Sequence, residues 1–125
     1  MTGLEIVLLC LAGGVGAALR FVLDGTVRHH SSGSFPLGTM IINVSGSFIL
    51  GLITGLVAGS VLTHGWQLVL GTGLMGGYTT FSTASLETVR LLEDRRWLAA
   101  AANGLGMLVI AVAAAAGGYA LGLWL

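Results

Sequence analysis

Four long apolar segments dominate this chain and limit the folds that it can adopt. They run over residues 4–23, 37–62, 66–90 and 97–125. A helix needs about 20 mostly apolar residues to cross the hydrocarbon core of a bilayer. The segments are continuously apolar rather than alternating, which excludes the strands of a membrane barrel. We therefore predict an all-α membrane protein in which residues 1–125 form a single membrane domain with four transmembrane helices.

The composition supports lipid as the solvent of this protein. The chain is 55% hydrophobic and only 8% charged, whereas about a quarter of the residues of a soluble domain are charged. The formal net charge is zero, so nothing indicates a nucleic-acid partner. The start, MTGLEIVLL, lacks a basic n-region, and we expect the first segment to stay in the mature protein as a helix.

Glycine is abundant, and its spacing favours close helix packing. There are 21 glycines, and small residues at every fourth position let helix backbones approach each other in a membrane. The GxxxG steps are Gly51–Gly55–Gly59, Gly73–Gly77 and Gly118–Gly122. GTGLMG, residues 71–76, also matches a dinucleotide-binding fingerprint, but no strand precedes it. Neither it nor any other motif indicates an enzyme.

The basic residues indicate an orientation. With four spans, the loops after the first and third span lie on one side of the membrane. All five basic side chains belong to that side, namely Arg20, Arg28, Arg90, Arg95 and Arg96. The positive-inside rule then predicts that both termini lie outside the cytoplasm. Arg20 lies near the end of its segment, where we expect its side chain to reach the interface or to be an internal structural residue.

The third segment contains GGYTTFSTAS, residues 76–85, which is unusual at membrane depth. Irregular backbone there is tolerated only where it is buried in protein or lines a polar cavity. Gly76 and Gly77 permit unusual dihedral angles, so we predict that the third helix breaks at its centre. Phe81 follows among hydroxyl residues, and a phenyl ring has a positive edge that can face an anion. The residues predict an ion site, while a kinked helix with Ser/Thr back-bonding stays an alternative.

Asn43 lies in TMIINVSGS of the second segment, close to Thr39. A buried amide in lipid needs hydrogen-bond partners. Asn43 therefore either joins two helices or lines an aqueous or ionic path, and the residue type does not decide between these roles.

GTMIINVSGSFILG, GTGLMGGYTTFSTASLET and GGVGAALRF together resemble the Fluc (CrcB) family of fluoride channels, and the resemblance covers all four segments. It implies passive F⁻ export and fluoride resistance by an antiparallel dimer in the cell membrane, with pores along the dimer interface. It also implies a central structural Na⁺ held by the backbone carbonyls of Gly76 and Thr79. The implied fluoride-contacting residues are Asn43, Phe81, Ser82, Thr83 and Thr39.

Three positions depart from the family pattern. Ala84 replaces the second phenylalanine that typical members have, and Met107 and Ala111 replace polar residues of the fourth helix, where only Asn103 stays polar. Homodimeric members insert in both orientations, so the strong arginine bias here favours one half of a heterodimer. A homodimer with an altered phenylalanine box is the alternative.

Two other functions stay open from the residues. A small four-helix multidrug exporter needs a carboxylate deep in its first span, and Glu5 lies too close to the start of the chain for that role. A non-transporting assembly subunit is compatible with the apolar residues at Ala84, Met107 and Ala111.

Overall fold

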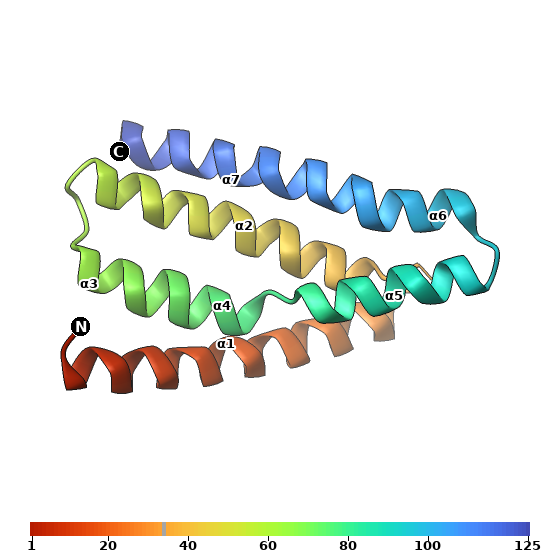
Figure 1. Ribbon diagram of the computed structural model, residues 1–125, viewed down its shortest axis with the longest axis horizontal. Helices are drawn as coiled ribbons and strands as arrows, with labels where there is room; N and C mark the ends of the chain where they lie inside the picture. The colour runs from red at the N-terminus through yellow and green to blue at the C-terminus, as the bar shows by residue number, and fades with distance from the viewer. Residues whose placement is uncertain (34) are drawn as a thin grey trace.

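The computed structural model describes residues 1–33 and 35–125, which form four antiparallel helical rods (Figure 1). The first two rods are α1 (Gly3–His30) and α2 (Leu37–Ala58). The third comprises α3 (His64–Trp66), η1 (Gln67–Met75), α4 (Gly76–Tyr78) and α5 (Phe81–Glu93). The fourth comprises α6 (Trp97–Ala101), η2 (Ala102–Gly106) and α7 (Met107–Trp124). The described residues contain no strand, which confirms the all-α prediction.

Three of the rods are long and apolar enough to cross a membrane without interruption. They are Gly3–His30, Leu37–Ala58 and Trp97–Trp124. The third rod differs because two extended residues separate α4 from α5 near its middle. The predicted break in the third helix is therefore present.

Local signals explain where the helices begin and turn. Thr2 and Glu5 form a capping box at the start of α1, in which each side chain accepts a hydrogen bond from the other residue's backbone N–H. After α2 and after α5 the chain turns through Ser60 (φ 63°) and Arg95 (φ 57°). These left-handed residues end each helix sharply, as residues just past a helix C-terminus commonly do.

Glycines bring α2 and α7 into backbone contact along their length. A Cβ at Gly51 or Gly55 would collide with the backbone of α7, and one at Gly118 or Gly122 with the backbone of α2. The predicted packing role of these four GxxxG glycines is confirmed. Gly59 differs, because the backbone nearest to it belongs to its own helix. A small buried cluster that includes Ile42, Ile53, Met75 and Tyr78 lies between α2 and the third rod.

The ends of the bundle differ in charge. Both termini and the turn between α2 and α3 lie at one end (Figure 1). Arg28, Arg90, Arg95 and Arg96 lie at or near the other end, where α1 and α5 finish. Arg20 does not lie at the end of its helix, because α1 continues through His30. The predicted segment, residues 4–23, ends seven residues before α1 does, so it places Arg20 closer to the membrane surface than the structure does.

Candidate functional site

The interruption of the third rod is the centre of the candidate site. Thr79 (φ −82°, ψ 161°) and Thr80 (φ −148°, ψ 124°) have extended backbone between α4 and α5. We predicted that the break lies at the diglycine, and this position is wrong. Gly76 and Gly77 are helical, and no described glycine has positive φ. Gly77 is needed for packing instead, since a Cβ there would collide with the Gly13 carbonyl on α1.

The amide of Asn43 holds the extended backbone in place. Its Nδ2 donates to the Thr80 carbonyl oxygen at 2.8 Å, and its Oδ1 accepts from the Thr80 N–H at 2.9 Å. A single side chain thus pairs with both the N–H and the carbonyl group of Thr80, where the helical hydrogen-bond pattern is interrupted. Thr80 in turn caps α5, because its Oγ1 accepts from the Thr83 N–H at 3.2 Å. Asn43 therefore joins two helices, the first of the two roles left open by its residue type.

Close packing of α2 supports the other side of the break. A Cβ at Gly46 would collide with Thr79 Cγ2 and lie 3.1 Å from the Tyr78 ring. The Tyr78 hydroxyl also forms a hydrogen bond of 3.0 Å with Ser45 Oγ, and Tyr78 is buried. The second helix therefore fixes α4 where it ends.

An open groove of about 540 Å³ runs along the face of the bundle that contains the break. Asn43 lies in its wall, and so does Phe81, whose side chain is 87% exposed. The other residues lining it are Gly46, Ser47, Leu50, Thr79, Thr80, Ala84, Ser85, Thr88, Asn103, Gly104, Met107, Leu108 and Ala111. The groove thus combines a partly unwound backbone, an exposed aromatic ring and an amide.

All three positions that depart from the family pattern lie in this groove. Ala84, Met107 and Ala111 contribute apolar surface to its wall. Asn103, in contrast, is 1% exposed, and its Nδ2 donates to Thr88 Oγ1 at 2.8 Å, while its Oδ1 is buried without a partner. Asn103 therefore connects η2 to α5 through its hydrogen bond with Thr88.

The remaining predicted fluoride-contacting residues lie elsewhere. Thr39 and Thr83 line a separate cavity of about 240 Å³ between α1, α2 and α5, together with Arg20. Ser82 is exposed and lines neither space. We predicted no site role for Arg20, because the predicted segment ends three residues after it. Because α1 continues through His30, this full positive charge lies inside the helix, where it is costly unless it faces protein or a water-filled cavity.

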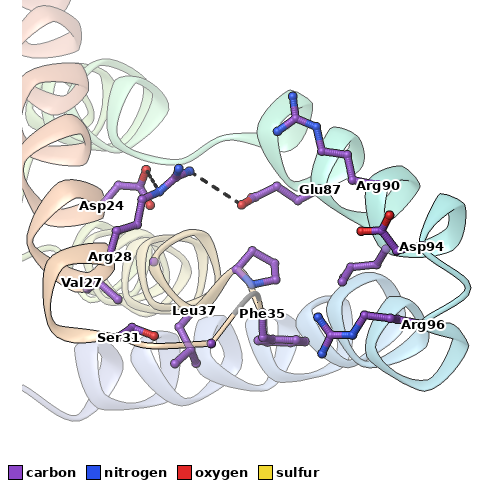
Figure 2. Close-up of a pocket in the computed structure, with 14 residues that line it drawn as sticks. Asp24, Val27, Arg28, Ser31, Phe35, Leu37, Glu87, Arg90, Asp94 and Arg96 are labelled. Carbon is purple, nitrogen blue, oxygen red and sulfur yellow. Dashed lines mark ion pairs between the residues drawn. The ribbon is translucent and has the colours of Figure 1, made fainter.

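A third, charged pocket of about 400 Å³ lies at the basic end of the bundle (Figure 2). Arg28 lies between two carboxylates there. Its Nε is 3.1 Å from Asp24 Oδ2, and its Nη2 is 4.0 Å from Glu87 Oε2. This arginine connects the end of α1 with α5. Arg90, Asp94 and Arg96 also line the pocket, so basic and acidic groups alternate around it.

The predicted sodium ligands lie next to the break. Gly76 is in the last turn of α4, and Thr79 is the first extended residue. The final carbonyl groups of a helix lack intrahelical partners, and carbonyl oxygen suits hard cations. A Cβ at Gly76 would have no neighbour within 4 Å, so no other segment packs against that side of the residue. The donor type and its position are compatible with a bound cation.

Comparison with known proteins identifies the family. The family described as CrcB-like protein, Camphor Resistance (CrcB), matches residues 7–119. The chain belongs to the CrcB family. The chain is 53% identical over 125 residues to fluoride-specific ion channel FluC 1 of Leifsonia xyli subsp. xyli, covering 100% of this chain and 88% of that protein. It is 44% identical over 119 residues to fluoride-specific ion channel FluC 3 of Bifidobacterium longum, covering 95% of this chain and 98% of that protein.

A third relative is fluoride-specific ion channel FluC 2 of Mycolicibacterium paratuberculosis, 49% identical over 105 residues, covering 84% of this chain and 83% of that protein. These relatives are ion channels of the FluC type, and the resemblance seen in the sequence motifs is confirmed. Membership in the CrcB family, with several apolar helices, makes this chain a multi-pass membrane protein and a transporter rather than an enzyme.

Proposed function

We propose that this chain is a subunit of a fluoride-selective channel that gives passive F⁻ export and fluoride resistance. The observation that carries the proposal is the extended break at Thr79 and Thr80, clamped by Asn43 and bordered by the exposed Phe81 ring in one groove. The names of the relatives support fluoride as the ion. Hydrogen fluoride enters a cell as a neutral acid and ionises at the higher internal pH, so a downhill path for F⁻ is sufficient.

The groove residues would replace the hydration shell of the ion. The edge of an aromatic ring is positive, so Phe81 attracts an anion without a full countercharge. Thr80 lines the groove and donates its O–H to Thr83 Oγ1 at 3.1 Å. Ser82 and Thr83 lie beside the groove in the first turn of α5, and their hydroxyl groups would offer O–H donors to the ion. A narrow, rigid path lined in this way selects a small anion because larger halides do not fit between the donors.

The channel would require a second subunit. Phe81 and Leu98 are 87% and 86% exposed in the single chain, and the groove is open on one side. We infer an antiparallel dimer in which a second subunit covers the groove. The basic residues at one end favour a single orientation, and the apolar Ala84, Met107 and Ala111 would weaken this chain's own pore wall. Both features favour a partner chain of opposite charge bias over a second identical copy.

The carbonyl groups of Gly76 and Thr79 would hold a Na⁺ where the two subunits meet. The ion would offset the carbonyl dipoles that gather at the breaks, which is a structural rather than a catalytic contribution.

Fluoride efflux from vesicles tests the assignment. We expect Phe81→Ile to lower fluoride efflux at least tenfold while leaving thermal unfolding unchanged, because the exposed ring makes little contact within the subunit. Phe48→Ile is the matched control, since Phe48 is outside the groove lining. Unchanged efflux in Phe81→Ile would contradict the proposal that the Phe81 ring lines the pore.

Two arms of the same assay test the assembly. Replacing sodium by choline should lower both efflux and the dimer fraction, and an unchanged dimer would argue against the Na⁺ site. Robust efflux from vesicles containing this chain alone would rule out an obligate heterodimer and favour the homodimer.

The multidrug-exporter alternative finds no support in the fold. Glu5 serves as a helix-capping residue at the start of α1. Proton-coupled cation transport by the purified chain would support the exporter alternative.

A further inference from the structure

The hydrogen bonds of Asn43 leave a single group for anything that enters the groove. An asparagine amide has two N–H donors and one carbonyl acceptor. The acceptor and one donor are used by the backbone of Thr80. The same Nδ2 also lies 3.2 Å from Met107 Sδ. The second N–H therefore points at a methionine sulfur.

This N–H···S contact is a poor use of a buried donor. A thioether is a weak hydrogen-bond acceptor, whereas a hydrogen bond to an anion is about twice as strong as one between neutral groups. Met107 is only 6% exposed although it lines the groove. The Met107 side chain therefore shields the Asn43 N–H from the groove but forms only a weak hydrogen bond with it.

The backbone around Met107 is irregular. The Met107 N–H bonds to the Ala102 carbonyl, five residues earlier, which marks the π-helical turn η2. Such turns are rare and often accompany functional sites. Met107 also lines the open groove of about 540 Å³, which offers space beside its side chain. Methionine is also the most adaptable apolar side chain, with three rotatable bonds and no branching. The side chain thus has both the freedom and the space to move.

We propose that Met107 controls anion access to Asn43, because its thioether occupies the N–H that an anion would otherwise receive. This inference rests on the proposed fluoride conduction. An anion binds at Asn43 only when the Met107 side chain leaves, so Met107 lowers the affinity of this groove for fluoride. Asn43 keeps its clamp on Thr80 throughout, since that clamp uses the other N–H and the oxygen.

Asparagine labelling makes this testable in the full chain. Asn43 and Asn103 are the two asparagines of the sequence, so ¹⁵N-asparagine labelling gives two side-chain amide nitrogen resonances, each with two proton cross peaks. Asn103 donates to Thr88 and serves as the internal reference. Sodium fluoride is titrated at constant ionic strength against sodium chloride, with the chain in nanodiscs. In Met107→Ala we expect the Asn43 signal to reach its half-maximal shift at a fluoride concentration at least fivefold lower than in the unmodified chain.

Two further variants keep the result interpretable. Met40→Ala removes a methionine of α2 outside the groove and should not alter the titration. Met107→Leu retains the side-chain volume but removes the sulfur, so the Asn43 proton signal should move before any fluoride is added while the Asn103 signal stays in place. Met107→Leu also serves if Met107→Ala does not fold.

The outcomes separate this inference from the proposed function. Equal half-maximal concentrations in Met107→Ala and the unmodified chain would overturn the role of Met107. An Asn43 signal that never responds to fluoride would overturn it too. If vesicles still release fluoride in either case, the channel function stands and only the role of Met107 fails. If vesicles that contain this chain together with a homologous chain of opposite charge bias release none, both proposals fail.

Discussion

At the scale of single residues, Asn43 connects the second helix to the interrupted third rod. It lies on α2, yet it supplies both hydrogen bonds that replace helical pairing for Thr80. An unsatisfied backbone group in a low-dielectric environment costs about 1–3 kcal/mol. The residue that resembles a pore donor by sequence is therefore also a structural clamp.

We expect Asn43→Ala to lower both stability and fluoride efflux. Removing the amide leaves the Thr80 N–H and carbonyl unpaired, so the free energy of unfolding should fall by about 2–4 kcal/mol for the two groups together. Thermal unfolding in detergent and vesicle efflux measure the two effects. Ser47→Ala, on the same helix and in the same groove, is the control. An unfolding temperature equal to that of the unmodified chain would contradict the clamp.

At the scale of helices, the bundle depends on backbone contact rather than on large apolar side chains. The α2–α7 pair packs through glycines on both helices. In a membrane no hydrophobic force brings helices together, because lipid tails are as apolar as leucine, so close packing has to supply the attraction.

Neighbouring glycines of α7 provide a matched test of this packing. A Cβ at Gly118 would collide with the Phe48 carbonyl of α2, whereas one at Gly117 meets nothing within 4 Å. We expect Gly118→Ala to destabilise the subunit by roughly 1–3 kcal/mol through overpacking. Gly117→Ala should be neutral or slightly stabilising, because alanine favours helix. Denaturation in mixed micelles compares them, and equal effects would mean that this contact is not tight.

At the scale of the whole molecule, charge distinguishes the two ends. Four arginines lie at or near the end where α1 and α5 finish, while the termini and the short α2–α3 turn lie at the other (Figure 1). Arg28 pairs with Asp24 within α1 and with Glu87 of α5, so its contact with Glu87 connects two helices at the basic end (Figure 2).

This asymmetry predicts one orientation, with both termini outside the cytoplasm. A C-terminal alkaline phosphatase fusion should be active, and a C-terminal green fluorescent protein fusion should stay dark. Replacing Arg90, Arg95 and Arg96 by glutamine should give a mixture, because only Arg20 and Arg28 remain to bias insertion. A bright fluorescent fusion of the unmodified chain would reverse the assigned orientation.

The helical class and the interruption of the third segment follow from the order of the amino acids alone. Apolar length and the lack of water in a bilayer leave few alternatives, and these constraints act on each segment separately. The motif residues Asn43 and Phe81 were also recognisable, since an amide and an aromatic ring among hydroxyls are unusual at membrane depth.

The position of the break and the set of residues that share the groove depend instead on packing between distant segments. The diglycine has the local freedom to unwind, but α1 packs against Gly77 and keeps it helical, while Asn43 stabilises an extended Thr80 from a position 37 residues earlier. Contacts between distant segments outweighed local preference. For the same reason Thr39 and Thr83 face the cavity of Arg20 rather than the groove, since the side to which a helical residue points depends on its neighbouring helices.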